Sequence, residues 1–137
     1  MSEERSRRER LAAEYTALSQ LVEEVRRRIE LLNATLNEVA SAKSALEELE
    51  IVEEGEELLV PIGAGVYVRT RISGKSEVLV TIGANILVEK SIEEARKYLD
   101  EREQKLRDLL QRHMSDYQSL VSRLGEIERE LRSRSGG

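Results

Sequence analysis

The sequence predicts an α+β protein in which a long antiparallel two-helix coiled coil carries two β-hairpins inserted between its helices. Three observations lead to this fold class. Apolar residues recur at alternating steps of four and three in both outer parts of the chain, and one phrase occurs twice in the middle. The third is composition: 36% of residues are charged and 3% are aromatic, which is too polar for a conventional globular core and favours an elongated molecule.

The repeated phrase organises residues 58–90. Residues 59–65 read LVPIGAG and residues 79–85 read LVTIGAN, and each copy continues into further β-branched residues. Such residues around a turn of small residues are typical of a tight hairpin. Four turn residues are of types that adopt positive φ at little cost: Gly63, Gly65, Gly83 and Asn85. The sequence therefore predicts two successive hairpins, linked by residues 73–76.

The two hairpins are too small to be stable alone. Four short strands bury little surface, and their unpaired edges invite another chain. We therefore expect an oligomer interface formed by the branched residues of the strands: Val60, Ile62, Val66, Val68, Val78, Val80, Ile82, Ile86 and Val88.

The first outer part of the chain carries a coiled-coil seam. Its apolar residues follow the heptad pattern: Leu11, Tyr15, Leu18, Val22, Val25, Ile29, Leu32, Leu36 and Val39. Lys43 and Leu46 take the next two places, and an acidic run at residues 53–57 ends the pattern. We expect a helix over residues 5–52.

The second outer part mirrors the first. Ser91 followed by Glu94 is a capping box, which predicts a helix over residues 91–132. Its seam consists of Leu99, Glu103, Leu106, Leu110, His113, Tyr117, Leu120, Leu124, Ile127 and Leu131. Pairing residues whose numbers sum to 142 gives eight layers, from Leu11 with Leu131 to Leu36 with Leu106. We expect one antiparallel coiled coil with the chain termini together at the end away from the hairpins.

Near the hairpins each helix has one charged residue in its seam. The mirror relation brings Lys43 and Glu103 into neighbouring layers. We predict that they approach each other and fix the register of the two helices at some cost in stability.

Composition excludes several classes of function. The chain has no Cys, so disulfides and thiolate metal sites are unavailable, and no apolar run approaches the ~18 residues of a membrane span. The charged start at residues 1–5 does not resemble a signal peptide, so a soluble cytoplasmic protein is expected. A net charge of −5 with both signs intermixed argues weakly against nucleic acid as the main partner.

No constellation in the sequence predicts an enzyme, a metal site or a cofactor. Gly63–Gly65 opens a strand rather than a helix, which indicates a turn and not a phosphate loop. His113 occupies a seam position with no second ligand predicted nearby. The acidic run at residues 53–57 and the Arg-rich residues 5–10 fit solvated helix ends, although a cation or an acidic partner remains an alternative for each.

The residues resemble the alpha subunit of archaeal prefoldin, a chaperone family. The similarity covers nearly the whole chain, and its most specific parts are residues 60–65, residues 82–84 and residues 88–95, which lead into the second helix. Two hairpins rather than one resemble the alpha class. Residues 1–137 would thus form a single prefoldin alpha-like domain.

The resemblance implies an assembly and an activity. It implies a hexamer of two alpha and four beta subunits, with the hairpins in a central β-barrel body and the coiled coils projecting from it. It also implies that unfolded client proteins are held without ATP at the coiled-coil tips and passed to a group II chaperonin. A gamma-type relative that forms filaments resembles the alpha class, so a structural scaffold or filament is the alternative function.

If the resemblance holds, client contacts should involve apolar residues near the tips. The outermost residues are polar, and the candidates lie just inside them: Leu11, Ala12, Ala13, Leu18, Leu21, Val121, Leu124, Ile127 and Leu131. The simpler interpretation is that those on the seam only pack the coiled coil. Leu21 and Val121 lie off the seam and could form an exposed stripe, while Gly125 would loosen this end of the second helix.

Overall fold

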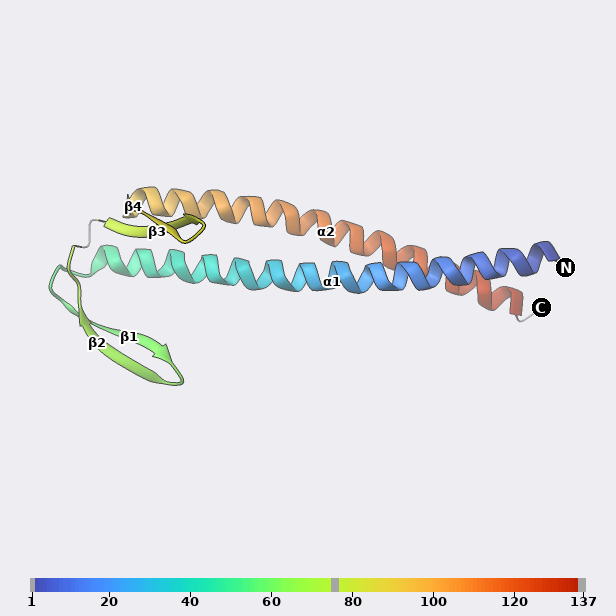
Figure 1. The fold of residues 1–137 in the computed structure, drawn as a ribbon, viewed down its shortest axis with the longest axis horizontal. Coiled ribbons are helices and arrows are strands. Elements are labelled where there is room, and N and C mark those ends of the chain that lie inside the picture. The colour runs from blue at the N-terminus through green and yellow to red at the C-terminus, as the bar shows by residue number, and fades with distance from the viewer. Residues whose placement is uncertain (1, 75–76, 136–137) are drawn as a thin grey trace. The chain divides into compact units, whose positions relative to one another are not determined.

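A computed structural model describes residues 2–74 and 77–135. The elements follow in the order α1 (Ser2–Ile51), β1 (Glu57–Gly63), β2 (Val66–Arg71), β3 (Glu77–Gly83), β4 (Ile86–Ser91) and α2 (Ile92–Ser135) (Figure 1). Two long helices with two hairpins between them were predicted, and this part of the fold class is confirmed. Both helices extend further toward the termini than the heptad pattern indicates. Of the predicted link, residues 75–76 lie outside the described residues.

The chain divides into two units, of which the first combines residues 1–36 with residues 105–137. It contains the N-terminal part of α1 and the C-terminal part of α2, which run antiparallel. Ion pairs connect them at Arg7 with Glu130 and at Glu14 with Arg123. Every residue of the eight predicted layers is buried or half-buried, as a coiled-coil seam requires.

The register of this unit follows from where the ion pairs lie. Glu14, Arg123 and Glu130 each directly precede a seam residue, and Arg7 lies one heptad before Glu14. Residues at such positions flank the seam. In an antiparallel coiled coil, those on the same flank of the two helices face one another. Both pairs fit the predicted layers, whereas a shift of one heptad would separate them.

The second unit, residues 37–104, holds the rest of both helices and the hairpins. Val39 and Leu46 are buried on α1, and Ala95 is buried on α2 with 2% of its surface exposed. The start of α2 is capped as predicted, because the Ser91 hydroxyl accepts the Glu94 N–H at 3.0 Å. The Glu94 carboxylate accepts the Ser91 hydroxyl at 3.1 Å, so the return contact of the capping box involves the side chain of Ser91.

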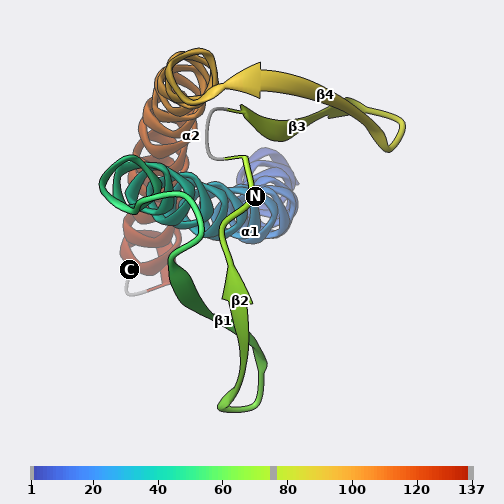
Figure 2. The same cartoon turned by 90° about the vertical axis from the view of Figure 1, so that its left-hand side faces the viewer.

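The two hairpins are separate two-stranded sheets (Figure 2). Their strands pair in the same register. In the first, Val60 lies opposite Val68 and Gly63 opposite Val66; in the second, the residues twenty positions on repeat both pairings. An irregularity before the turn leaves Ile62, and in the second copy Ile82, as the extra residue.

The turns require left-handed backbone, as predicted from their glycines and asparagine. The predicted residues Gly63, Gly65, Gly83 and Asn85 all have positive φ. Ala64 at 51° and Ala84 at 46° share this conformation, which the sequence did not indicate. Both central residues of each two-residue loop thus have positive φ, which defines a type I′ turn and matches the twist of the strands.

Candidate functional site

The branched residues predicted for oligomerisation form one apolar face on each hairpin. Because side chains alternate along a strand, Val60, Val66 and Val68 share a face of the first hairpin. In the second hairpin the corresponding face holds Val78, Val80, Ile86 and Val88. We call these the valine faces. None of their residues is buried, and neither are Ile62 and Ile82 at the irregular positions.

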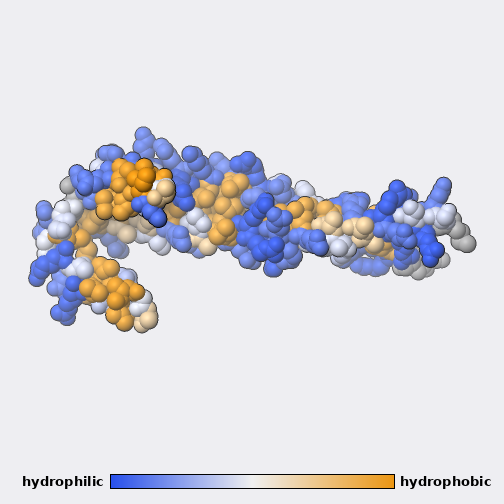
Figure 3. All heavy atoms as spheres, viewed as in Figure 1, coloured by the Kyte–Doolittle hydropathy of each residue, from blue (hydrophilic) through white to orange (hydrophobic). Residues whose placement is uncertain are grey.

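The opposite faces are also apolar, and sequence analysis missed them. Near the turns of the first hairpin Leu59 and Tyr67 share a face, and in the second Leu79 and Leu87 do. We call these the leucine faces. Their four large side chains are 56–61% exposed. On the face drawn in Figure 3, apolar side chains gather in a patch on each hairpin. The available signal was that both alternating sets of residues in LVPIG and LVTIG are apolar, as in strands buried on two sides.

The predicted client contacts lie near the free helix ends, by which we mean the N-terminal part of α1 and the C-terminal part of α2. They occupy three different environments. Leu11 and Ile127 are buried, and Ile127 has no exposed surface. Leu18, Leu124 and Leu131 are half-buried in the seam. Ala12, Ala13, Leu21 and Val121 are exposed. The seam candidates thus pack the coiled coil in this structure, and only those off the seam present surface.

Leu21 and Val121 are 42% and 43% exposed, but they do not form one stripe. Leu21 lies one heptad after Glu14 and shares its flank of α1. On α2 that flank carries Arg123, and Val121 lies two positions earlier, about 200° around the helix. The two side chains are therefore on opposite flanks of the seam, because the sum of 142 relates residues within the seam and not beside it.

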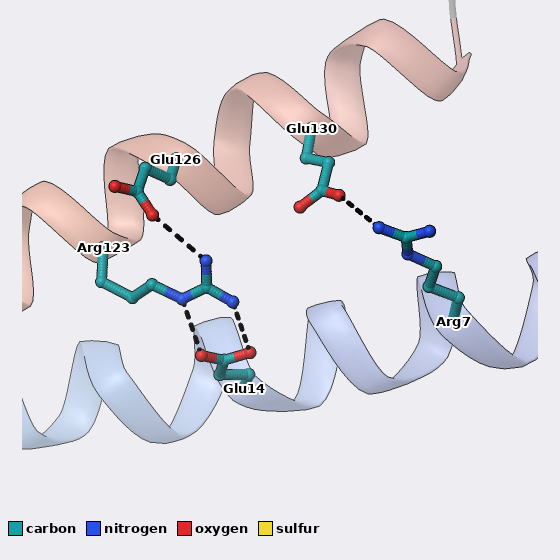
Figure 4. A network of polar contacts seen from close by, with 5 residues as sticks. All are labelled: Arg7, Glu14, Arg123, Glu126 and Glu130. Atoms are coloured by element: carbon teal, nitrogen blue, oxygen red, sulfur yellow. Dashed lines mark hydrogen bonds and ion pairs between the residues drawn. The ribbon is translucent and has the colours of Figure 1, made fainter.

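A network of charged side chains joins the free ends (Figure 4). Arg123 donates from Nε and Nη2 to the two carboxylate oxygens of Glu14 at 2.8 and 3.0 Å, and from Nη1 to Glu126 at 3.2 Å. Arg7 reaches Glu130 at 3.1 Å. The hydrogen bonds from Arg123 hold the pKa of Glu14 below its usual range, and their carboxylate partners raise the pKa of Arg123.

Tyr15 adds a further contact between the helices at this end. Its hydroxyl donates to Glu128 Oε1 at 2.9 Å. This hydrogen bond to an anion, with the negative charge itself, raises the pKa of Tyr15. Polar contacts thus hold the two helices together at the free ends, beside a seam in which Ile127 is fully buried.

In the second unit the predicted polar layer is present. Lys43 Nζ lies 3.6 Å from Glu103 Oε2, which confirms the predicted approach, and 2.7 Å from Asp100 Oδ1, which was not predicted. The hydrogen bond to Asp100 is the main cause of the raised pKa of Lys43. Next to this layer the last turns of α1 and the start of β1 line an apolar pocket of about 510 Å³ with Leu46, Leu49 and Leu58.

Other candidate chemistry is sparse. Within residues 2–74 and 77–135 no group of three His, Cys, Asp or Glu side chains is arranged to hold a metal ion. His113 is half-buried in the seam. None of the described helices has a stretch long and apolar enough to cross a membrane.

Comparison with known proteins identifies the family to which this arrangement of helices and hairpins belongs. The sequence matches the family of prefoldin subunits over residues 18–137. The chain belongs to the prefoldin family. It is 47% identical to a prefoldin subunit alpha from Thermofilum pendens, over 91% of this chain and 97% of the relative. It is 33% identical to a prefoldin subunit alpha from Pyrococcus horikoshii, over 95% and 88% respectively.

A solved structure supports the same prefoldin fold. A chain in the cryo-EM structure of filamentous PFD from Methanocaldococcus jannaschii matches with a TM-score of 0.73 and 26% identity, over 86% of this chain and 98% of that one. Prefoldins are chaperones rather than enzymes, and these relatives are archaeal. The predicted family resemblance is confirmed, and an oligomeric prefoldin assembly is implied.

Proposed function

We propose that this chain is the alpha subunit of a cytoplasmic prefoldin hexamer with two alpha and four beta subunits. One observation carries the proposal: in a chain 47% identical to a prefoldin subunit alpha, both hairpins expose apolar faces and unpaired strand edges. Such surface is stable in water only when another chain covers it. A β-barrel body built from the valine faces of several subunits would remove both the edges and the exposed apolar area.

The hexamer would capture unfolded proteins at the free helix ends, without ATP, and pass them to a group II chaperonin. Ala12, Ala13, Leu21 and Val121 offer apolar contact directly. Leu11, Leu18, Leu124, Ile127 and Leu131 would contribute only if the last heptads separate. Gly125, within α2, supports such opening because glycine lowers helix stability by about 1 kcal/mol relative to alanine.

Reconstitution tests the proposal. The purified chain is mixed with a one-hairpin prefoldin beta subunit, and the mass of the product is measured by light scattering after size exclusion. The same fraction is added to a denatured client whose aggregation is followed by turbidity. A closed complex of two alpha and four beta chains that delays aggregation is expected. A chain that remains monomeric with the partner would contradict the proposal.

The alternative is a filament-forming, structural prefoldin. It is favoured by one observation, the 0.73 TM-score to a chain described as filamentous PFD. Polymerisation of the chain alone, with no closed complex in the mixture, would support this second function.

A further inference from the structure

The two hairpins are copies of each other in backbone and differ in the charge of their leucine faces. Arg69 lies opposite Leu59, and Glu89 lies opposite Leu79 at the equivalent place of the second hairpin. Ser91 of the second hairpin is equivalent to Arg71 of the first, whereas both hairpins have a glutamate at the paired place, Glu57 and Glu77. The first leucine face therefore carries two basic residues and one acidic residue, whereas the second carries two acidic residues and no basic one.

These charges adjoin exposed apolar surface on each hairpin. Arg69 is exposed, and its contact to Glu57 within the hairpin is long, at 3.8 Å from Nε to Oε1. A guanidinium has five N–H donors, so Arg69 can bind a second carboxylate while keeping this contact. The exposed apolar residues and the neighbouring charge thus form a surface that a similar surface of opposite charge would complement.

Charge decides which hairpins fit together. Two copies of the first leucine face would bring arginines together, and two copies of the second would bring carboxylates together. Pairing of the first face with the second places Arg69 near Glu89 and removes both repulsions.

We infer that the leucine face of the first hairpin docks on the leucine face of the second hairpin in another copy of this chain. Made reciprocally, the two contacts are related by a two-fold axis and close a dimer, because each copy supplies one face of each kind. The inference rests on the proposed function for the hairpins as the assembly surface, and it names the partner of the leucine faces. It also fits two alpha copies in one hexamer, with the valine faces left for the barrel.

Charge reversal in full-length chains tests this pairing. R69E places carboxylates at both position 69 and position 89, and E89R places guanidinium groups at both, so each variant alone is expected to self-associate several-fold to about tenfold more weakly than the wild type. An equimolar mixture of R69E and E89R restores both Arg–Glu contacts between copies and should recover wild-type association. The double variant R69E/E89R should recover it as well.

The measurement is sedimentation velocity at low salt, repeated at about 1 M salt, where the Debye length of about 3 Å should reduce the differences. R8E, which makes the same charge change as R69E but on α1 in the other unit, is the matched control and should associate like the wild type. Circular dichroism verifies that each variant is helical.

The inference would be overturned by a wild-type chain that is monomeric at every concentration, by single variants that associate normally, or by a mixture that associates no more strongly than its components. Rescue in the double variant without rescue in the mixture would also overturn it, because the faces would then pair within one chain. Mass measurement with the beta subunit keeps the two proposals apart. A normal hexamer with no charge effect refutes only the pairing, and rescue without a hexamer refutes only the hexamer.

Discussion

Arg123 of α2 and Glu14 of α1 form a two-point ion pair, with Nε to Oε1 at 2.8 Å and Nη2 to Oε2 at 3.0 Å. It is a parallel pair of charge-assisted hydrogen bonds, which has defined geometry as well as attraction. Since it lies beside the layers of the free ends, it opposes the separation of the helices that would release the buried apolar residues.

We predict that this pair makes the stability of the free ends sensitive to acid. The pKa of Glu14 is lowered in the folded state, so its contribution is present above the ordinary value of 4.5 and is lost as pH falls through the lowered value. E14Q should lower the melting temperature at pH 7, and the gap to the wild type should close as pH falls below 4.5 and through the lowered pKa of Glu14. Thermal melts by circular dichroism measure this.

Glu9 provides the matched control, since it is a glutamate of the same helix and is exposed, whereas Glu14 is half-buried. E9Q should leave a much smaller gap at pH 7. A gap for E14Q that is unchanged at acidic pH would show that the carboxylate charge is not what stabilises the pair.

A second prediction concerns Gly125. A Cβ at this position would meet Arg129 Nη1 at 3.6 Å, an ordinary contact, so alanine fits. G125A should stabilise the chain by about 1 kcal/mol in urea unfolding. If client capture needs the free ends to open, the same variant should suppress aggregation less well. A stabilised variant with full activity would argue against opening.

A third prediction concerns the first hairpin turn, where Gly65 has φ 77° and Ala64 has φ 51°. G65A should destabilise the hairpin by roughly 1–2 kcal/mol, because a side chain is disfavoured in left-handed backbone. A64G should instead stabilise it by up to about 1 kcal/mol. Hydrogen exchange of the β1 and β2 amides reports both changes, and each variant controls the other. Effects of the same sign would contradict the turn type.

A fourth prediction concerns the polar layer, in which Lys43 is 29% and Glu103 25% exposed. K43M should lower the melting temperature at pH 7, because Glu103 would keep a half-buried charge without this cation. K43M/E103L should recover or exceed the wild-type value at pH 7. The gap between K43M and the wild type should shrink as pH rises beyond 10.5 and through the raised pKa of Lys43, where the wild type loses the same cation. A double variant as unstable as K43M would mean that Asp100 matters more than the layer.

Much of the fold was predictable because two simple patterns encode it: the heptad repeat of the helices and the hairpin phrase that recurs after twenty residues. The heptad seam identifies the layers of the first unit, since packing of two helices requires apolar residues at those places. The glycines and Asn85 identify the turns, since left-handed backbone favours them. Ala64 and Ala84 were missed because the two-residue loop imposes positive φ on both central residues and overrides the preference of alanine.

The candidate sites were predicted less completely. β-Branched residues indicated the valine faces, but Leu59 and Tyr67 belong to the other alternating set, and emphasis on branched residues concealed them. Asp100 was missed because heptad positions locate seam residues, whereas a flexible lysine side chain can reach a carboxylate beside the seam. The predicted stripe of Leu21 and Val121 is absent because residues beside the seam pair by a different rule from residues within it.

The central claim is that the free helix ends hold the client while the hairpins hold the assembly. The most direct measurement compares the full chain with a version containing residues 16–126, each reconstituted with the beta subunit and brought to the same complex mass. Turbidity of a denatured client should rise slowly with the full chain and quickly with the truncated one. Equal suppression of aggregation by complexes of equal mass would contradict the account and place the client site elsewhere.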